Sequence, residues 1–229
     1  MAVHVITGAG SGIGRVLTQR LHERGDDLWL VARDDERAAA FRSVFPGSHT
    51  LIADLSDPRS LAAAMDAQRR PSRVDSLLHV AGIVELGPIA ETPVEAWQQQ
   101  LDVNAVAPAE LTRILLPALR AARGHIVFVN SGAGLRVHPD WGSYAASKFA
   151  VRAIADALRE EERPHGVRVT TVYPGRTATP MQEKVHRQEG AEYDAARWMQ
   201  PSSVATTVLM ALDLPRDAEV TELMVRPGA

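Results

Sequence analysis

The chain alternates short apolar runs with longer amphipathic stretches. The apolar runs are rich in Val, Ile and Leu, and they read VHVIT (3–7), LWLVA (28–32), TLIA (50–53), SLLHVAG (76–82), HIVFVN (125–130), VRVTTVY (167–173) and VTELMV (220–225). Near-continuous apolar runs of this kind are expected of strands that are covered on both faces. The pattern therefore predicts seven strands of a buried, parallel sheet.

Helix-like stretches lie between these runs. Examples are GRVLTQRLHERG (14–25), DPRSLAAAMDAQRR (57–70) and LTRILLPALRAARG (111–124), the last with Gly124 as its expected C-cap. Alternation of strand and helix is typical of α/β folds. We predict a Rossmann-type, doubly wound, parallel seven-stranded sheet with helices on both faces, forming a single domain over residues 1–229. The polar stretch 181–200 is the expected substrate lid.

Composition narrows the class of protein. The 229 residues carry a net charge of -3, and the arginines are scattered, so we expect neither a nucleic acid nor a membrane partner. The absence of cysteine excludes disulfides, thiolate metal ligands and thiol catalysis, and we assign no metal ligands. No apolar run approaches a membrane span, and the first strand starts too early for a signal peptide. We expect a cytoplasmic enzyme.

The segment VHVITGAGSGIGRVLTQRL joins the first predicted strand to a helix through a glycine turn. Gly8, Gly12 and Gly14 allow a sharp turn and a close approach to phosphate, and the helix start offers free N–H groups. The spacing T-G-x-x-x-G-x-G differs from the strict G-x-G-x-x-G fingerprint. A tight connection without a ligand is the alternative, but the position after the first strand favours a nucleotide.

The end of the second predicted strand, LWLVARDDER, is expected to contact the adenine ribose. A carboxylate there suits the free 2′-hydroxyl of NAD, whereas an arginine suits the 2′-phosphate of NADP. Arg33 comes first and favours NADP(H). NAD(H) stays open because Asp34 or Asp35 could serve the ribose, although Asp34 is also a natural N-cap for the next helix.

Tyr144 and Lys148 are spaced i, i+4 and therefore share one face of a helix. A free phenol has a pKa near 10, and a neighbouring ammonium would stabilise the phenolate. Ser131 ends the strand HIVFVNS, at the strand edge where doubly wound folds place ligands. Its hydroxyl could donate to a substrate carbonyl, or it could be a simple turn residue.

The order and spacing of several motifs resemble the short-chain dehydrogenase/reductase family, in its single-domain branch. The motifs are TGAGSGIG (7–14), Asn104 in LDVNAVAP, Ser131, YAASK (144–148) and YPGRTATPM (173–181), and they span essentially the whole chain. The resemblance implies hydride transfer between NADP(H) and an alcohol or carbonyl carbon.

The resemblance also implies roles for single residues. Tyr144 would be the general acid/base, Lys148 would lower its pKa and bind the nicotinamide ribose, and Ser131 would orient and polarise the carbonyl. Asn104 would hold a water that links Lys148 to solvent, or would only kink a helix. The implied cofactor contacts are Gly8, Ser11, Gly12, Ile13, Gly14, Arg33, Asp54, Leu55, Ala81, Gly82, Tyr144, Lys148, Pro174, Gly175, Thr177 and Thr179.

One departure from the family pattern concerns the fourth strand, where HVAG (79–82) replaces N-N-A-G. Val80 removes an asparagine side chain that ties neighbouring strands together in the family. An apolar replacement of similar volume can be nearly neutral if the partner has also changed. We interpret Val80 as a structural variation that weakens the case for activity without removing it.

The substrate pocket is expected between Ser131 and Tyr144, after Gly82 and under the lid. The expected lining is Val84, Leu86, Leu135, Val137, His138, Trp141, Met181 and Trp198, which favours a small, apolar alcohol, ketone or aldehyde. No arginine pair is obviously placed for a carboxylate, although Arg136 and Arg176 stay open. His138 is either a second acid or a histidine on a surface loop.

The predicted helices at 101–120 and 144–163 carry alanine and leucine around more than one face. Such surfaces are buried by other helices or by a second subunit, and the family pairs subunits there. We therefore expect a homodimer or homotetramer. The alternative function is a catalytically silent dinucleotide-binding or sensing protein of the same fold. The retention of Ser131 together with Tyr144 favours the enzyme.

Overall fold

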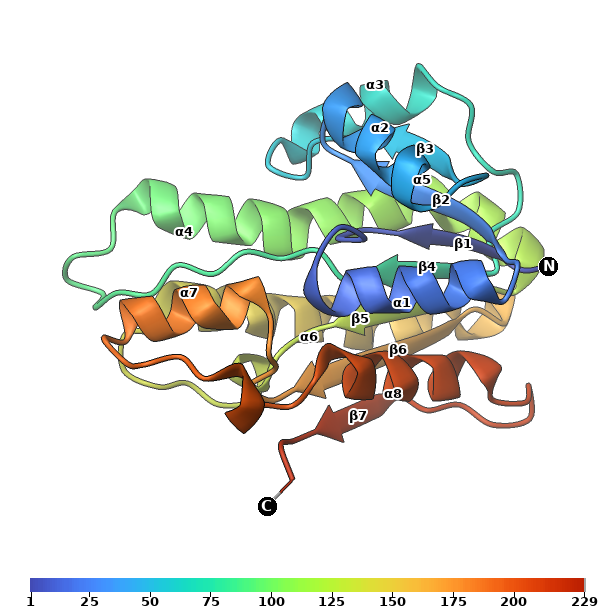
Figure 1. Ribbon diagram of the computed structural model, residues 1–229. Helices are drawn as coiled ribbons and strands as arrows, with labels where there is room; N and C mark the ends of the chain where they lie inside the picture. The colour runs from blue at the N-terminus through green and yellow to red at the C-terminus, as the bar shows by residue number, and fades with distance from the viewer. Residues whose placement is uncertain (229) are drawn as a thin grey trace.

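A computed structural model describes residues 1–228 and contains a seven-stranded sheet of parallel strands in the order β3-β2-β1-β4-β5-β6-β7 (Figure 1). The strands are β1 (Val3–Ile6), β2 (Asp27–Ala32), β3 (His49–Ile52), β4 (Ser76–His79), β5 (His125–Val129), β6 (Arg168–Pro174) and β7 (Glu222–Val225). Each coincides with one of the apolar runs. The predicted doubly wound sheet and the single domain are confirmed.

Helices cover both faces of the sheet (Figure 1). They are α1 (Gly12–Glu23), α2 (Asp35–Val44), α3 (Leu61–Asp66), α4 (Val94–Leu101), α5 (Ala107–Ala122), α6 (Gly142–Glu162), α7 (Pro180–Gln188) and α8 (Pro201–Asp213). Within residues 1–228, none of these helices is both long enough and apolar enough to cross a membrane.

The core consists of two apolar layers, one on each side of the sheet. Side chains of α1, α2 and α8 pack on one face, and side chains of α3, α5 and α6 pack on the other. Successive strand residues serve opposite layers: Val5 belongs to the α5/α6 side and Ile6 to the α1/α8 side. Because both faces of the central strands are buried, these strands lack the apolar–polar alternation of a half-exposed sheet, whereas the edge strand β7 is partly exposed.

Helices α4 and α5 form one rod that is interrupted by a π-helical turn, Asp102–Val106. Asn104 lies within this turn and is almost fully buried. A π-turn inserts one extra residue per turn and is frequent at functional sites. The turn therefore gives Asn104 an orientation that a regular helix would not.

The end of α5 differs in detail from the expected glycine cap. The left-handed C-cap residue is Arg123, with φ of 50°, and the backbone N–H of Gly124 donates to the carbonyl of Leu119. Gly124 is required for a different reason, since a Cβ atom there would lie 2.6 Å from the carbonyl oxygen of Val74. The glycine permits the close approach of two backbones rather than a left-handed turn.

This assignment predicts the effect of Gly124→Ala. The added methyl group meets a backbone oxygen that cannot rotate away, so we expect an overpacking cost of about 2 kcal/mol in the free energy of unfolding. Gly47→Ala is the matched control: its φ is +85° and its Cβ meets open space, so only backbone strain of about 1 kcal/mol is expected. Urea titrations measure both. A smaller loss for Gly124→Ala than for Gly47→Ala contradicts the assignment.

Candidate active site

The glycine turn between β1 and α1 packs directly against the end of β4. Gly8 has φ of +72°, and a Cβ atom on it would lie 2.7 Å from the backbone nitrogen of Ala81. Gly14 lies against the carbonyl oxygen of Gly8, which leaves no room for a side chain. Strand order reverses between β1 and β4, and doubly wound folds bind ligands at such a switch point.

The hydroxyl of Thr7 links β1 to the end of β4, a connection that the Val80 side chain cannot make. Thr7 Oγ1 accepts hydrogen bonds from the backbone N–H groups of Val80 (3.0 Å) and Ala81 (3.1 Å). His79 makes a second tie, because its Nε2 lies 2.8 Å from the hydroxyl of Thr112 on α5. The backbone at Ala81 and Gly82 is therefore held in place although the family asparagine is absent.

The loop after β6 reaches across to the start of α1. A Cβ atom on Gly12, where φ is +50°, would lie 2.9 Å from the side chain of Thr179. Helix α1 begins at Gly12, so its first N–H groups point toward this loop. The structure thus brings together the two ends of the predicted cofactor site, from the turn at residues 7–14 and from residues 174–179.

At the end of β2, Arg33 and Asp34 lie side by side. Arg33 Nε is 2.8 Å from Asp34, and the Arg33 side chain is 79% exposed. The other carboxylate oxygen of Asp34 accepts the backbone N–H of Arg37 at 2.7 Å, so Asp34 is the N-cap of α2 as expected. These two hydrogen bonds lower the pKa of Asp34, the backbone one being the larger cause.

Arg37 is a candidate cofactor residue that the sequence interpretation missed. Its guanidinium lies against Gly10 of the glycine turn, where a Cβ atom would collide with it. The signal in the sequence that could have identified Arg37 is its position four residues after Arg33. Asp54 and Leu55 lie after β3, the neighbour of β2; Asp54 accepts hydrogen bonds from Ser56, and Leu55 packs against the core.

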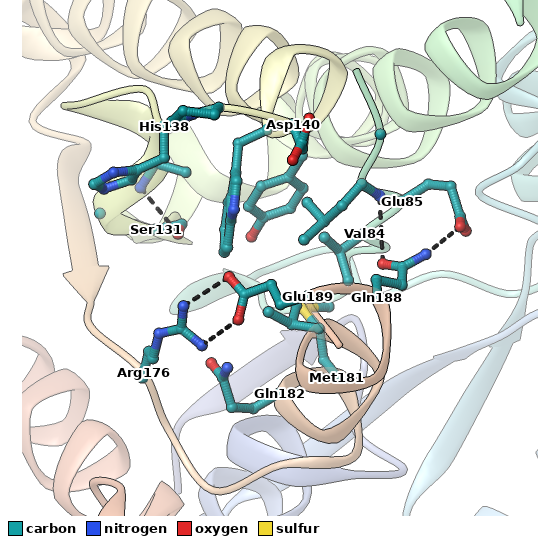
Figure 2. A pocket seen from close by; sticks show the side chains of 18 of the residues that line it. Val84, Glu85, Ser131, His138, Asp140, Arg176, Met181, Gln182, Gln188 and Glu189 are labelled. Atoms are coloured by element: carbon teal, nitrogen blue, oxygen red, sulfur yellow. Dashed lines mark hydrogen bonds and ion pairs between the residues drawn. The ribbon is translucent and has the colours of Figure 1, made fainter. Parts of the chain in front are cut away.

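Tyr144 and Lys148 lie on the inner face of α6, as the spacing predicts, and both are almost fully buried. Lys148 Nζ is 5.8 Å from the centroid of the Tyr144 ring and 3.5 Å from the carbonyl oxygen of Val129. Ser131 follows β5, and its Oγ accepts the N–H of Ala133 at 3.1 Å (Figure 2). The hydroxyls of Ser131 and Tyr144 line one cavity.

Burial dominates the protonation of both groups. It raises the pKa of Tyr144 to about 12, opposed in part by the Ser131 hydroxyl, and it lowers the pKa of Lys148 to about 8. In the chain alone, therefore, Lys148 does not bring the pKa of Tyr144 below its ordinary value, in contrast to the expectation from the sequence. The physical reason is that the phenolate would be desolvated and the ammonium lies on the ring side at 5.8 Å.

Asn104 and Gln100 fasten this face of α6 to the loop after β4. Asn104 donates to the carbonyl of Ile83 (2.9 Å) and to Ser147 Oγ (3.0 Å), and its Oδ1 accepts the N–H of Ile83 (2.8 Å). One turn earlier, Gln100 donates to Ser143 Oγ at 2.7 Å. Both residues therefore position the segment that carries Tyr144.

Asn130 is a second residue that sequence reasoning missed. It is buried at the end of β5, and its Nδ2 donates to the backbone carbonyl of Lys148 at 3.0 Å. A Cβ atom on Gly134 would lie 2.9 Å from the same amide. Asn130 thus ties the backbone of α6 at Lys148 to the strand that carries Ser131. A polar residue ending an otherwise apolar strand was the available signal.

A cavity of about 1250 Å³ opens at the carboxyl edge of the sheet (Figure 2). Of the predicted site residues, it brings together Ile13, Ser131, Tyr144, Pro174, Gly175, Thr177 and Thr179. Val84, Leu86, His138, Trp141 and Met181 line it as expected, whereas Leu135, Val137 and Trp198 do not. Trp198 instead contacts His186 and lies 5.4 Å from the Arg176 guanidinium. Charged side chains make the lining more polar than the sequence predicted.

The segment 181–200 covers this cavity with α7. Arg176 pairs with Glu189 through two hydrogen bonds of 2.8 and 2.7 Å (Figure 2). Lys184 pairs with Glu85 at 2.6 Å, and Gln188 also hydrogen-bonds to Glu85. These contacts join the middle and the C-terminal end of α7 to the rim. Movement of this segment as a lid stays a prediction.

Comparison with known proteins identifies the family. The sequence profile of the family described as short chain dehydrogenase matches residues 2–190. The chain belongs to this family. This short-chain dehydrogenase is 35% identical in sequence to dehydrogenase/reductase SDR family member 7B of Bos taurus. The match covers 92% of this chain and 70% of that protein.

Two solved structures of the family are similar to this short-chain dehydrogenase. A short chain dehydrogenase from Escherichia coli CFT073, complexed with NADPH, is 28% identical, with a TM-score of 0.84 over 97% of this chain and 95% of that chain. A 3-oxoacyl-[acyl-carrier protein] reductase from Brucella melitensis with bound NAD is 27% identical, with a TM-score of 0.82 over 98% and 89%.

The burial of Lys148 predicts a stability gain for Lys148→Met in this short-chain dehydrogenase. The pKa of Lys148 falls from 10.5 to about 8 on folding, so its charged form costs up to about 3 kcal/mol at neutral pH. Between these two pH values the unfolded chain holds the extra proton. The advantage of Lys148→Met is therefore largest below pH 8 and shrinks as the pH rises toward 10.5.

Denaturant titrations at pH 7 and pH 9.5 measure this difference. Lys184→Met is the control, because Lys184 is the other lysine and its side chain is 42% exposed. An advantage of Lys148→Met that is the same at both pH values would argue against an uncompensated buried ammonium.

Proposed function

We propose that the protein is an NADP(H)-dependent oxidoreductase that transfers a hydride between the nicotinamide and an alcohol or carbonyl carbon. The observation that carries this proposal is the shared cavity, which the hydroxyls of Ser131 and Tyr144 line from one side and residues 174–179 from the other. A binding protein would need the glycine turn but would not need two hydroxyls converging on the same space.

The chain's residues fit a dinucleotide. Gly8, Gly12 and Gly14 lie where any Cβ atom would collide, so the turn is shaped for close backbone approach. The start of α1 would bind the pyrophosphate through its N–H groups, with Thr179 beside it. When bound, the nicotinamide supplies or accepts the hydride. Pro174, Gly175 and Thr177 would hold its carboxamide side.

The protein's own groups would manage the proton and the carbonyl. In the reductive direction, Ser131 donates a hydrogen bond to the substrate carbonyl oxygen, and Tyr144 transfers its phenolic proton to that oxygen as the hydride reaches the carbon. Lys148 stabilises the phenolate that remains, and its position on α6 also suits the ribose hydroxyls. The oxidative direction reverses these steps.

Asn104 has two proposed roles. Its hydrogen bonds to Ile83 and Ser147 make it a positioning residue for α6. Its Oδ1 and Lys148 Nζ both border Gly82, at 3.2 and 3.6 Å from the point that a Cβ atom on Gly82 would occupy. This proximity supports the proposed water link between Lys148 and solvent.

NADP(H) is the proposed cofactor because Arg33 is exposed at the end of β2 and Asp34 is engaged as an N-cap. Arg37, against the glycine turn, adds a second positive charge on the same side. The similar structure from Escherichia coli contains NADPH, and the one from Brucella melitensis contains NAD, so NAD(H) remains a candidate for weaker use.

We also propose a homodimer or homotetramer formed through the α4–α5 rod and α6. The outward side chains there include Val106 and Phe149, which are 46% and 39% exposed. A cytoplasmic location and a small apolar stem on the substrate stay predictions. The stem would pack on Val84, Leu86, Trp141 and Met181.

Tyr144→Phe tests the chemistry. Removal of one hydroxyl takes away the proton donor, so we expect kcat for NADPH-dependent carbonyl reduction to fall by about 10²-fold or more, while the Kd for NADPH stays within about twofold because the ring remains. Tyr173→Phe is the control: its hydroxyl bonds Glu222 and does not line the cavity. Full activity of Tyr144→Phe would favour another acid, and an inactive wild type that binds NADPH would favour the silent binding protein.

Arg33→Ala tests the cofactor preference. Loss of charge-assisted hydrogen bonds to a 2′-phosphate should weaken NADPH by about tenfold to a hundredfold and NADH by less than about twofold. Fluorescence titration measures both Kd values. Arg42→Ala is the control, since Arg42 lies farther along α2 and bonds to Thr50. An equal loss for both cofactors would show that Arg33 does not read the 2′ position.

A further inference from the structure

Arg226 enters the cavity from the C-terminal end of the sheet, although it is distant from the other site residues in sequence. Strand β7 pairs with β6 up to Pro174 and Val225, and the N–H of Gly175 donates to the carbonyl of Val225 at 2.7 Å. The next residue, Arg226, lines the cavity that Ser131 and Tyr144 line. Sheet pairing thus fixes the backbone from which this side chain extends.

Two glycines make room for the Arg226 side chain. A Cβ atom on Gly132 would lie 2.9 Å from Arg226 Nη1, and a Cβ atom on Gly175 would lie 3.5 Å from Arg226 Cδ. Gly132 directly follows Ser131, and Gly175 directly follows β6. The guanidinium therefore rests on bare backbone next to the serine that we propose to hold the substrate carbonyl.

Arg136, in the turn after β5, is a second arginine of the cavity lining. Its backbone N–H donates to the carbonyl of Gly132 at 3.1 Å, and its side chain lines the cavity. Gly132 thus contacts the guanidinium of Arg226 and the backbone of Arg136, so the two residues enter the cavity from neighbouring positions.

The cavity lining also holds four carboxylates, Glu85, Glu91, Asp140 and Glu189, and two of them are paired with other cations. Arg176 is paired with Glu189, and Glu85 is paired with Lys184. In the described part of the chain, residues 1–228, neither Arg136 nor Arg226 forms an ion pair. Asp140 lies on the same upper side of the pocket as Ser131 but apart from it (Figure 2), and within residues 1–228 neither Asp140 nor Glu91 forms an ion pair with an arginine. The Arg226 guanidinium, which lies against Gly132 next to Ser131, therefore has no carboxylate partner among residues 1–228.

We infer that the substrate carries a carboxylate, which Arg136 and Arg226 bind while Ser131 and Tyr144 hold its reacting carbonyl. The inference rests on the proposed oxidoreductase function and narrows its substrate class to short oxo acids and the matching hydroxy acids. Arginine suits this role because its planar fork binds a carboxylate with two parallel hydrogen bonds. The apolar side chains across the cavity contact the short carbon stem.

Matched acids and esters test the inference. The probes are 3-oxobutanoate and 4-oxobutanoate, each compared with its methyl ester, with NADPH consumption as the readout. We expect kcat/KM to be about tenfold or more higher for the better acid than for its ester. Arg136→Gln and Arg226→Gln should each lower this acid-to-ester ratio by about tenfold, through KM for the acid, and Arg226→Lys should retain part of it.

Arg163→Gln is the matched control, because Arg163 is exposed at the far end of α6 and pairs with Glu160; its acid-to-ester ratio should equal that of the wild type. An acid-to-ester ratio near one in the wild type, or a ratio that both Arg136→Gln and Arg226→Gln preserve, overturns the inference and leaves the proposed oxidoreductase function in place.

Phosphate is the other anion that the site could select. If kcat/KM favours glyceraldehyde 3-phosphate over glyceraldehyde by a larger factor than it favours the acid over its ester, the inference is also overturned.

A binding measurement separates the inference from turnover. Calorimetry compares butanoate with butanamide as ligands of the NADP⁺-saturated protein. Binding of butanoate that is lost in Arg226→Gln supports the carboxylate site even if none of the carbonyl probes is reduced, an outcome that counts against the proposed function alone. Equal binding of acid and amide, or a weaker affinity of Arg226→Gln for NADP⁺ itself, overturns the inference.

Discussion

The site depends on a ladder of buried hydrogen bonds between two helices. Gln100 and Asn104, one turn apart on the α4–α5 rod, meet Ser143 and Ser147, one turn apart on α6, and both also bond to the backbone of the loop after β4. Buried polar networks of this kind fix one geometry because each unpaired member would be costly. The π-turn is part of the same network, since it sets the orientation of Asn104. These hydrogen bonds fix the position of α6 and therefore of Tyr144 and Lys148.

A positive charge is buried where the helices and the sheet meet. Lys148 has one protein acceptor within hydrogen-bonding distance among residues 1–228, at the limiting distance of 3.5 Å, and burial alone accounts for the lowered pKa. A fold selected only for stability would place an apolar side chain there. A buried charge at this position fits the role that we propose for Lys148 at a bound cofactor, because strained or destabilised positions concentrate at functional sites.

The sequence predicts the features that are local or that follow from burial on both faces of the sheet. The seven strands, the Tyr144–Lys148 face and the N-cap role of Asp34 belong to this group. It could not predict Arg226 in the cavity, because β7 must first pair beside β6 for that side chain to reach Ser131. The raised pKa of Tyr144 could not be predicted either, because the phenol loses its water only when α6 packs against the rest of the chain.

The glycine turn and the cavity beside it are built on different principles. The turn, which we propose holds the cofactor, consists of backbone with glycines whose Cβ atoms would collide with neighbouring chain, so few changes are tolerated there. The substrate side of the cavity consists of side chains from α7, the turn after β5 and the end of β7, which are attached to the sheet at its edge. Substitutions on that side can alter the charge and shape that a substrate meets without moving Ser131 or Tyr144. Such a division lets one set of chemical groups serve different substrates, and in this chain the end of β7 places the Arg226 guanidinium beside Ser131.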